Sequence, residues 1–459
     1  MPEALWTADE IAKAAHGTLS GQPFAATGIS IDSRDIAPGD LFVALAGARD
    51  GHEFVPAAME RGAAGALVAR PIGGACVVVD DTLRALEAMG AAARDRSQAR
   101  RCAVTGSVGK TGVTQAVMAG LSRAGRAHSS IKSYNNHIGV PLTLARMPRD
   151  TERAVFEIGM NHAGEIEPLS RMVKPQAVAI TTVGPVHIEN FTDGEEGVAR
   201  AKAEIFAGLE PDGVAVLNAD NVWFDLLNDA ARKAGAEVRS FGTGEGCDAR
   251  LTSFEEPNVR ATIHGHPVNF PILQTGLHWA LNSLCVLLLL EAMDVDLETG
   301  MAALADFQPL AGRGAVKTVH AKGGDFTLID ESYNANPISM AAALRSLGAR
   351  PATGRRIVVL TDMLELGPEA PRWHAGLAEP IEAADVDLVF CAGPQMKSLW
   401  EALPATRQGA YAETAAALSP RVVSAVESGD VVMVKGSNGS KAGEIAAALS
   451  ALDDARAGG

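Results

Sequence analysis

Short apolar runs alternate with longer amphipathic segments along the chain, most regularly in its last third. Apolar runs at residues 326–330, 356–360, 387–391 and 431–435 are each followed by a segment of helical character. Strands that alternate with helices in this way predict a parallel sheet covered by helices on both faces. Gly312 and Gly314 lie before this block and predict a hinge at its start.

The rest of the chain divides into two further blocks. Apolar runs at 41–45 and 76–79 predict strands in the first block, and the polar, arginine-rich stretch 94–101 predicts a linker after it. In the middle block, runs at 154–158 and 177–181 predict buried strands and residues 281–293 predict a buried helix. The expected fold is therefore α/β with three domains, at residues 1–98, 99–311 and 312–459.

Composition narrows the possible function and location. The 459 residues carry a net charge of −15, which argues against nucleic acid as a partner because no surplus of cations exists to neutralise phosphates. The longest apolar stretch, residues 284–290, is far shorter than the ~20 residues of a membrane span. The start lacks the pattern of a signal peptide, and five cysteines without a C-x-x-C pair favour a reducing cytoplasm.

The strongest single motif is a glycine-containing loop between an apolar strand and a helix. Residues 102–111 read CAVTGSVGKT, and Val113, Val117 and Leu121 then repeat at helical spacing. Backbone amides at a helix N-terminus attract phosphate, while Lys110 can reach the β and γ phosphates and Thr111 can offer a hydroxyl to Mg²⁺. The predicted ATP-binding loop consists of Thr105, Gly106, Ser107, Val108, Gly109, Lys110 and Thr111.

Two other clusters predict no site. The glycines of residues 242–246 lack a following lysine and the dinucleotide spacing, so they predict a surface turn and NAD chemistry is disfavoured. His264 and His266 have no further ligands beside them and predict an exposed strand edge or turn.

Three polar residues downstream of the loop require a joint explanation. Glu157 ends an apolar strand, at the sheet edge where ligands bind, and His187 follows the next strand. Lys202 lies in a helix of small and apolar residues. Taken singly, each has a structural alternative: a solvated carboxylate, a structural histidine and a snorkelling lysine.

Motifs along the whole chain resemble those of the Mur ligase family of peptidoglycan precursor synthesis. They are IDSRDIAPGDLFVAL at 31–45, TGSVGKT at 105–111, NNHIGVPLT at 135–143, EIGMNHAGEI at 157–166, DESYNANP at 330–337, TDMLELG at 361–367 and KGS at 435–437. The resemblance implies a small N-terminal UDP-substrate domain, a central ATPase domain with a mostly parallel sheet, and a C-terminal Rossmann-like domain.

The resemblance also implies the reaction. It is an ADP-forming ligation in which D-alanyl-D-alanine is joined to the terminal carboxylate of a UDP-N-acetylmuramoyl-tripeptide through an acyl phosphate. ATP and two Mg²⁺ ions are the expected cofactors, with Lys202 carbamylated by CO₂ so that it becomes an anionic ligand. The implied metal and catalytic residues are Lys110, Thr111, Glu157, His187 and Lys202.

Further binding residues follow from the resemblance alone. Asn282 is expected at the adenine and Arg313 at the phosphate or ribose, with Asp330 and Glu331 as competing candidates for the ribose. In the first block, Ser33, Arg34, Asp50 and His52 are expected near the uridine diphosphate. The other implied substrate residues are Asn135, Asn136, Tyr333, Asn334, Asn336, Lys435 and Ser437.

Two kinds of alternative remain open. One is a related amide ligase, resembling folylpolyglutamate synthase or the muramyl ligase that adds the third residue. The other is a nucleotide-dependent switch that makes no new bond. The expected enzyme acts on small molecules as a monomer, with no membrane span.

Overall fold

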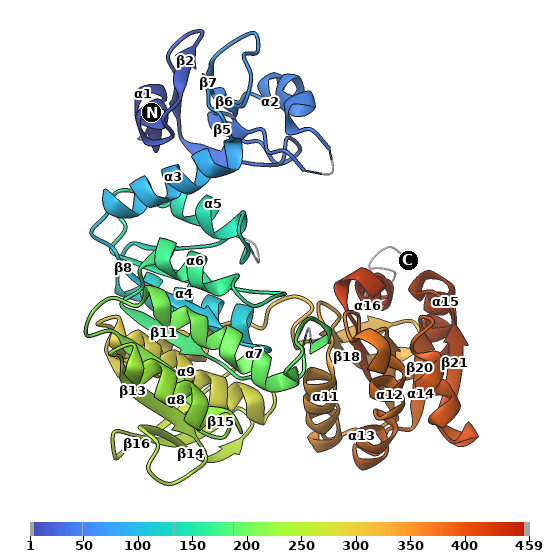
Figure 1. Ribbon diagram of the computed structural model, residues 1–459. Helices are drawn as coiled ribbons and strands as arrows, with labels where there is room; N and C mark the ends of the chain where they lie inside the picture. Colours follow the sequence, from blue (N-terminus) through green and yellow to red (C-terminus); the bar gives the residue numbers. More distant parts are fainter. Residues whose placement is uncertain (1–3, 48, 132–133, 187, 454–459) are drawn as a thin grey trace.

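A computed structural model describes residues 4–47, 49–131, 134–186 and 188–453, which form three regions, each built around a main sheet (Figure 1). The first region has a five-stranded sheet in the order β2-β7-β6-β5-β4 and a separate β1-β3 pair. Its elements are β1 (Trp6–Thr7), α1 (Ala8–Ala14), β2 (Thr18–Ser20), β3 (Ala25–Ala26), β4 (Gly28–Ser30), β5 (Asp40–Val43), α2 (Val55–Glu60), β6 (Gly65–Val68), β7 (Cys76–Val78) and α3 (Thr82–Asp95).

The central region contains a nine-stranded sheet in the order β16-β15-β14-β13-β12-β11-β8-β10-β9. Strands β9 to β14 pair in parallel, while β14, β15 and β16 form an antiparallel extension. The strands are β8 (Arg100–Thr105), β9 (Ala127–Ser129), β10 (Arg153–Glu157), β11 (Ala177–Ile180), β12 (Val214–Asn218), β13 (Glu237–Gly242), β14 (Ala249–Glu255), β15 (Asn258–Ile263) and β16 (His266–Pro271).

Helices cover both faces of the central sheet. Apolar side chains of α4 and α9 form one core cluster with the strands, and those of α5 to α8 form another on the opposite face. The helices are α4 (Lys110–Ala124), α5 (Gly139–Ala145), α6 (Ile166–Val173), α7 (Gly194–Ala203), α8 (Phe224–Lys233), α9 (Leu277–Ala292) and α10 (Leu297–Asp306). The carboxyl ends of the parallel strands remain available for ligands.

The C-terminal region has a six-stranded sheet in the order β17-β18-β22-β19-β20-β21, parallel except for β17 at one edge. The strands are β17 (Ala315–Ala321), β18 (Gly324–Glu331), β19 (Arg356–Thr361), β20 (Leu388–Ala392), β21 (Gln408–Ala412) and β22 (Val431–Lys435). The helices are α11 (Pro337–Ala349), α12 (Ala370–Ala375), α13 (Ala378–Ala383), α14 (Lys397–Ala402), α15 (Ala415–Ala425) and α16 (Ala442–Ser450).

The predicted α/β fold and all of the predicted strands are confirmed, with ends shifted by one to two residues. The strands that the sequence analysis missed include the buried β6 and β12 and also β14 to β17 and β21. Among the latter, β15 alternates buried and exposed side chains, while the edge strands β16, β17 and β21 are mostly exposed or half-buried. Such edge strands lack the continuous apolar run that marks a buried parallel strand.

The prediction of a linker at residues 94–101 is wrong. Helix α3 extends to Asp95 and β8 begins at Arg100, so only a short turn separates them. Buried Arg94 donates to the carbonyl of Met172 at 2.6 Å, and buried Arg101 donates to the carbonyl of Val173 at 2.8 Å. Arginines that satisfy the last carbonyls of α6 bind the segment to the central region instead of leaving it free.

The glycine cluster and the histidine pair adopt the local structure that the sequence predicts. Residues 243–246 form an exposed turn between β13 and β14, and His264 lies in the turn between β15 and β16.

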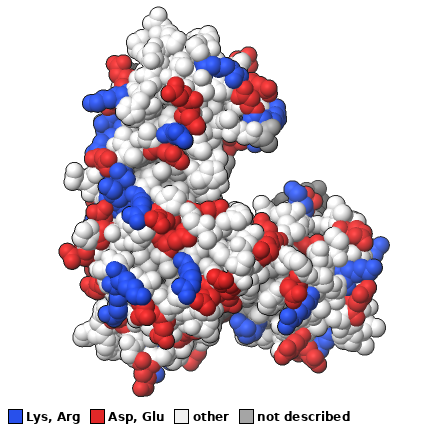
Figure 2. Space-filling view, viewed as in Figure 1, with Lys and Arg blue, Asp and Glu red and all other residues white. Residues whose placement is uncertain are grey.

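On the face shown in Figure 2, lysines and arginines are interspersed with acidic residues, and the surface is hollowed between the first and C-terminal regions. Among the described residues, no helix combines the length and apolarity needed to cross a bilayer.

Candidate active site

The phosphate loop joins β8 to α4, as the sequence predicts. Gly106 has φ of +146°, and a Cβ there would come within 2.0 Å of the Thr181 hydroxyl oxygen, so the tight turn requires glycine. Ser107 Oγ donates to the Gly184 carbonyl and accepts from the Gly184 amide, both at 3.1 Å. These contacts hold the loop against the carboxyl end of β11.

Lys110 opens α4 and faces the loop. Its Nζ donates to the Gly106 carbonyl at 2.7 Å, so the ammonium lies against the loop. Burial lowers the pKa of Lys110; Glu157 opposes this shift and Arg313 adds to it. The C-terminal region therefore already brings a second cation close to this lysine.

Glu157 ends β10 and is buried, with 4% of its surface exposed. Its Oε1 accepts a hydrogen bond from Asn135 Nδ2 at 2.7 Å. A buried carboxylate held by an amide, and close to a lysine, is an oxygen donor that can hold Mg²⁺.

Lys202 lies in α7 and is 2% exposed. Its ammonium makes no hydrogen bond or ion pair with the residues that the structure describes. Burial and the charge of Lys110 hold the pKa of Lys202 well below its usual value, against the opposing charge of Glu204 and Glu157. Such an amine is readily neutral, which is the state that reacts with CO₂.

The structure describes only some of the residues predicted to bind the metal ion. Thr111, Glu157 and Lys202 belong to one neighbourhood, whereas His187 lies outside the described residues. Within the described part of the chain, no group of three or more histidine, cysteine, aspartate and glutamate side chains is placed to hold a metal ion.

A pocket of about 640 Å³, called the main pocket below, lies between the phosphate loop and the C-terminal region. Both regions contribute predicted residues to its lining. These are Ser107, Val108, Gly109, Lys110, Thr111, Asn135, Glu157, Asn282, Arg313, Glu331, Tyr333, Asn334, Asn336, Lys435 and Ser437. Thr105 and Gly106, also predicted, do not line it.

The C-terminal side of the main pocket is held by specific contacts. The Arg313 guanidinium lies over the Tyr333 ring, 4.1 Å from its centroid. Lys435 Nζ pairs with Glu331 Oε2 at 3.2 Å and donates to the Asn334 carbonyl at 3.0 Å. Cations and amides are thus fixed opposite the phosphate loop.

The structure separates the two candidates for the ribose. Glu331 lines the main pocket, whereas Asp330 does not and is hydrogen bonded to residues on either side of it in the sequence. Asp330 accepts the Ser332 hydroxyl at 2.6 Å and the Gly312 amide at 3.1 Å. Of the two candidates, Glu331 is therefore the one that faces the main pocket, and Asp330 shapes the turn.

Asn282 also lies at the main pocket. A Cβ on Gly109 would meet its Nδ2 at 3.1 Å, so Asn282 lies beside the loop. Trp279 packs against Gly112, while His278 lines the pocket.

Sequence reasoning missed several polar lining residues, namely Thr181, Thr182, Asn218, His278, Ser339 and Arg345. The two threonines were detectable, because they directly follow the predicted strand at 177–181.

The residues predicted in the first region line neither pocket described here. His52 is buried, with Nδ1 2.7 Å from Asp50 Oδ1 and Nε2 accepting the Ala69 amide at 2.8 Å. The second carboxylate oxygen of Asp50 pairs with Arg70, and exposed Arg34 pairs with Asp32. Ser33 lies beside this pair and is half-buried.

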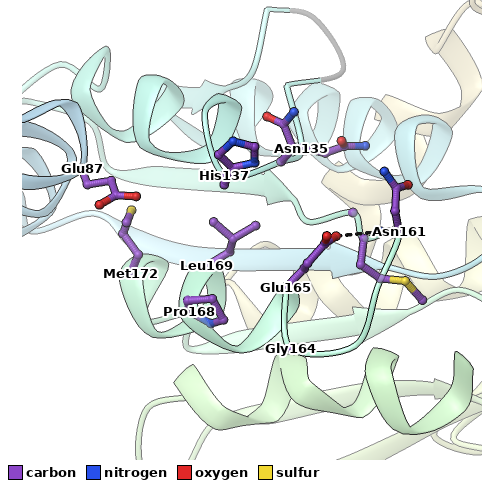
Figure 3. A pocket seen from close by; sticks show the side chains of 12 residues that line it. Glu87, Asn135, His137, Asn161, Gly164, Glu165, Pro168, Leu169 and Met172 are labelled. Atoms are coloured by element: carbon purple, nitrogen blue, oxygen red, sulfur yellow. Dashed lines mark hydrogen bonds between the residues drawn. The ribbon is translucent and has the colours of Figure 1, made fainter. Parts of the chain in front are cut away.

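A second pocket of about 390 Å³, called the α3–α6 pocket below, lies between the first and central regions (Figure 3). Glu87 of α3 contributes to it from one side, and Leu169 and Met172 of α6 from the other. Asn135 lines both pockets and Asn136 only this one, so the α3–α6 pocket adjoins the main pocket.

Comparison with known proteins agrees with this geometry. Three family models match, described as the Mur ligase family catalytic domain (residues 25–80), the Mur ligase middle domain (104–290) and the Mur ligase glutamate ligase domain (315–438). A UDP-N-acetylmuramoyl-tripeptide–D-alanyl-D-alanine ligase of Escherichia coli is 33% identical, over 96% of this chain and 98% of its own. The chain belongs to the Mur ligase family.

Two further relatives match this Mur ligase over most of its length. A ligase of the same name from Rickettsia prowazekii is 31% identical over 91% of this chain and 94% of its own. The crystal structure of MurF from Acinetobacter baumannii matches with a TM-score of 0.85 at 29% identity, covering 98% of this chain and all of that one. The three-region architecture therefore matches the whole of that structure.

Proposed function

We propose that this Mur ligase uses ATP to join D-alanyl-D-alanine to the terminal carboxylate of a UDP-N-acetylmuramoyl-tripeptide, in peptidoglycan precursor synthesis. The relatives that match over almost the whole chain carry that name. The observation that carries the proposal is the main pocket, where the phosphate loop of one region faces Arg313 and Lys435 of another. A pocket closed by two regions suits a reaction that must align a nucleotide and two peptides.

The chemistry begins with a poor electrophile. A peptide carboxylate becomes reactive when its oxygen takes the γ-phosphoryl group of ATP, which gives an acyl phosphate and ADP. The residues assist by position and charge, because phosphoryl transfer needs little covalent help from the protein. Lys110 and Arg313 would neutralise the phosphates, and Asn282 and Glu331 would bind the adenine and ribose side.

The second step is attack by the amine of D-alanyl-D-alanine on the acyl carbon. A tetrahedral species forms, the amine loses a proton, and phosphate leaves with the former carboxylate oxygen. The C-terminal side of the main pocket would orient the dipeptide by its polar groups. Tyr333, Asn334, Asn336, Lys435 and Ser437 are the candidates for this role.

The residues also fit Mg²⁺. The donors are oxygens: the hydroxyl of Thr111, the carboxylate of Glu157 and, after reaction with CO₂, a carbamate on Lys202. Carbamylation joins the neutral amine nitrogen to the carbon of CO₂ and releases one proton, so a neutral amine becomes an anion; the ammonium form must first lose a proton of its own. The burial of the Lys202 side chain, together with the lack of a hydrogen bond or ion pair to the described residues, supports this assignment. Mg²⁺ would supply positive charge to the phosphoryl oxygens.

We assign the uridine diphosphate end of the substrate to the first region, with Ser33 and Arg34 as contacts. Asp50 and His52 already bind one another, so their proposed part is to shape the turn that follows β5.

The division into domains at 1–98, 99–311 and 312–459 remains a proposal, with α3 as the element that joins the first two. The five free cysteines support a cytoplasmic setting.

The test is ADP release, measured with ATP, the tripeptide and D-alanyl-D-alanine together and with each omitted in turn. Fast release should require both peptides. A nucleotide-dependent switch would instead hydrolyse ATP slowly with neither peptide present, and that result would refute the ligase.

A further inference from the structure

The α3–α6 pocket contains a carboxylate that has no partner. Glu87 of α3 is half-buried and lines the pocket, and its carboxylate makes no hydrogen bond or ion pair within the described ranges of the chain. Glu60, on α2 of the same region, is exposed and lines neither pocket. A half-buried acceptor at a cavity has lost part of its water, and it gains most from a cationic ligand.

The second carboxylate of this pocket is already in use. Glu165 Oε2 accepts the Asn161 amide at 2.8 Å, and Oε1 lies 3.1 Å from His162 Nδ1. Burial raises the pKa of Glu165, but these hydrogen bonds outweigh it and the net pKa lies below its usual value. Glu165 therefore remains ionised and adds negative potential, while Glu87 is the carboxylate free to bind.

The rest of the pocket is apolar or uncharged. Figure 3 shows Glu87 and Glu165 toward opposite ends in this view, with Leu169 and His137 between them and Pro168 and Met172 on the α6 side. No lysine or arginine is among the described residues that line it. An apolar wall with a carboxylate at one end matches an alkyl chain that ends in an ammonium.

The position of the α3–α6 pocket beside the main pocket indicates which part of the substrate would reach it. Asn135 lines both pockets and donates to Glu157, so the α3–α6 pocket begins beside the reacting centre. In the proposed function, the terminal carboxylate of the tripeptide lies at that centre. The side chain attached to the same α-carbon then lies nearest to the α3–α6 pocket.

We propose that the α3–α6 pocket selects the third residue of the tripeptide by a side chain that ends in an ammonium group, with Glu87 as its partner. This inference rests on the proposed function and deepens it. Lysine and diaminopimelate share that ammonium, so both are accepted by the same contact. Glu87 acts on specificity and takes no part in the chemistry.

The experiment compares tripeptides that end in lysine, diaminopimelate or norleucine, the last having the lysine chain without its charge. The wild-type enzyme should prefer both charged substrates to norleucine in kcat/KM. Glu87→Gln should lower kcat/KM for both charged substrates by roughly tenfold to a hundredfold and leave norleucine unchanged. The matched control, Glu60→Gln, removes an exposed carboxylate from the same region and should change none of the three.

Charge reversal adds a result that a structural role cannot produce. Glu87→Lys should gain activity toward a tripeptide ending in 2-aminoadipate while losing the lysine substrate. Equal use of lysine and norleucine by the wild type, an equal loss on all substrates in Glu87→Gln, or a loss confined to diaminopimelate would each overturn the inference. Turnover of none of the tripeptides would overturn the proposed function itself, and this inference with it.

Discussion

The main pocket and the first region use their polar side chains in opposite ways. In the main pocket, cations and amides from segments far apart in the sequence face one space, and the hydrogen bonds of Lys110 within the described part of the chain go to carbonyls of its own loop. In the first region, Asp50, His52 and Arg70 satisfy one another, and Arg34 pairs with Asp32.

This difference shows which parts of a site a local sequence motif can determine. The phosphate loop is set by local backbone geometry, since Gly106 and the start of α4 determine where Lys110 lies. Recognition by the first region depends on side chains that already have partners and must exchange them for ligand. We therefore expect substitutions in the main pocket to reduce catalysis, and those in the first region to reduce binding by smaller amounts.

The largest effect is expected for Lys110→Ala. Loss of the ammonium beside the phosphates should lower kcat by about a hundredfold or more, because its charge acts on the transition state. Steady-state ADP release measures this effect, and circular dichroism checks that the fold survives. A folded variant that keeps more than about a tenth of kcat, a loss below ~1.4 kcal/mol, would show that Lys110 is not at the γ-phosphate.

Lys202 gives the next effect and sharpens the account of the metal. Lys202→Ala should lose nearly all activity, and Lys202→Arg should do no better, because a guanidinium is permanently charged and cannot be carbamylated. Excess acetate should restore part of the alanine variant's kcat by supplying an anionic oxygen in the vacated space.

The choice of rescue agent is the control for this prediction. A lysine that acts as a plain cation would be replaced by methylamine and not by acetate. Rescue by methylamine alone would therefore refute the carbamate and leave Lys202 as a phosphate-binding residue.

Asn282→Ala and Arg34→Ala test the comparison directly. Asn282→Ala should raise KM for ATP by roughly tenfold and leave KM for D-alanyl-D-alanine unchanged, since the lost hydrogen bonds reach only the nucleotide. Arg34→Ala should raise KM for the UDP-linked tripeptide by a few-fold and leave KM for ATP unchanged. Equal rises for every substrate would indicate a folding defect in either variant.

Point variants suit the first region better than truncation. Leu142 and Ala145 of α5 pack into the core that contains Trp6 and Leu86. Removal of the first region would expose that apolar surface of the central region, so the loss of binding could not be separated from the loss of stability.

The smallest effect concerns the wall of the main pocket. Fully buried His374 accepts the Met363 amide through Nε2 at 3.0 Å, beside the lining residues Leu364 to Leu366, and its Nδ1 donates to the Ala370 carbonyl. Burial lowers the pKa of His374. Folding favours the neutral form of His374. Its contribution to the free energy of unfolding is therefore complete above the ordinary pKa of about 6.5 and is lost as the pH falls through that value.

Urea unfolding at pH 8 and pH 5 measures this contribution. Between these pH values, the wild type should lose about 1 kcal/mol more than His374→Gln does. An identical pH dependence in the two proteins would show that His374 does not titrate with folding.

The sequence predicted several of the parallel strands and the phosphate loop because both depend on local patterns. A run such as 356–360 is apolar on both faces only when helices cover the sheet, and a strand, turn and lysine in order define the loop. The motif residues of the C-terminal region, such as Arg313 and Lys435, were found through resemblance and lie in the main pocket as expected.

Contacts between side chains and backbone groups far apart in the sequence could not be predicted from local patterns. The choice between Asp330 and Glu331 depends on the Gly312 amide, 18 residues earlier in the chain, which binds Asp330. Arg94 and Arg101 appeared to be linker residues because their partners, the last carbonyls of α6, become neighbours only after folding. Glu87 carried no motif at all, and only the α3–α6 pocket gives it a role.

The central claim is that the peptide carboxylate is phosphorylated and then displaced by the amine. Label the terminal carboxylate of the tripeptide with ¹⁸O, allow one turnover with ATP and D-alanyl-D-alanine, and analyse the released phosphate by mass spectrometry. The account predicts one ¹⁸O atom in each phosphate, since the carboxylate oxygen leaves with phosphorus. Phosphate that carries no ¹⁸O would contradict it, because its fourth oxygen would then have come from water.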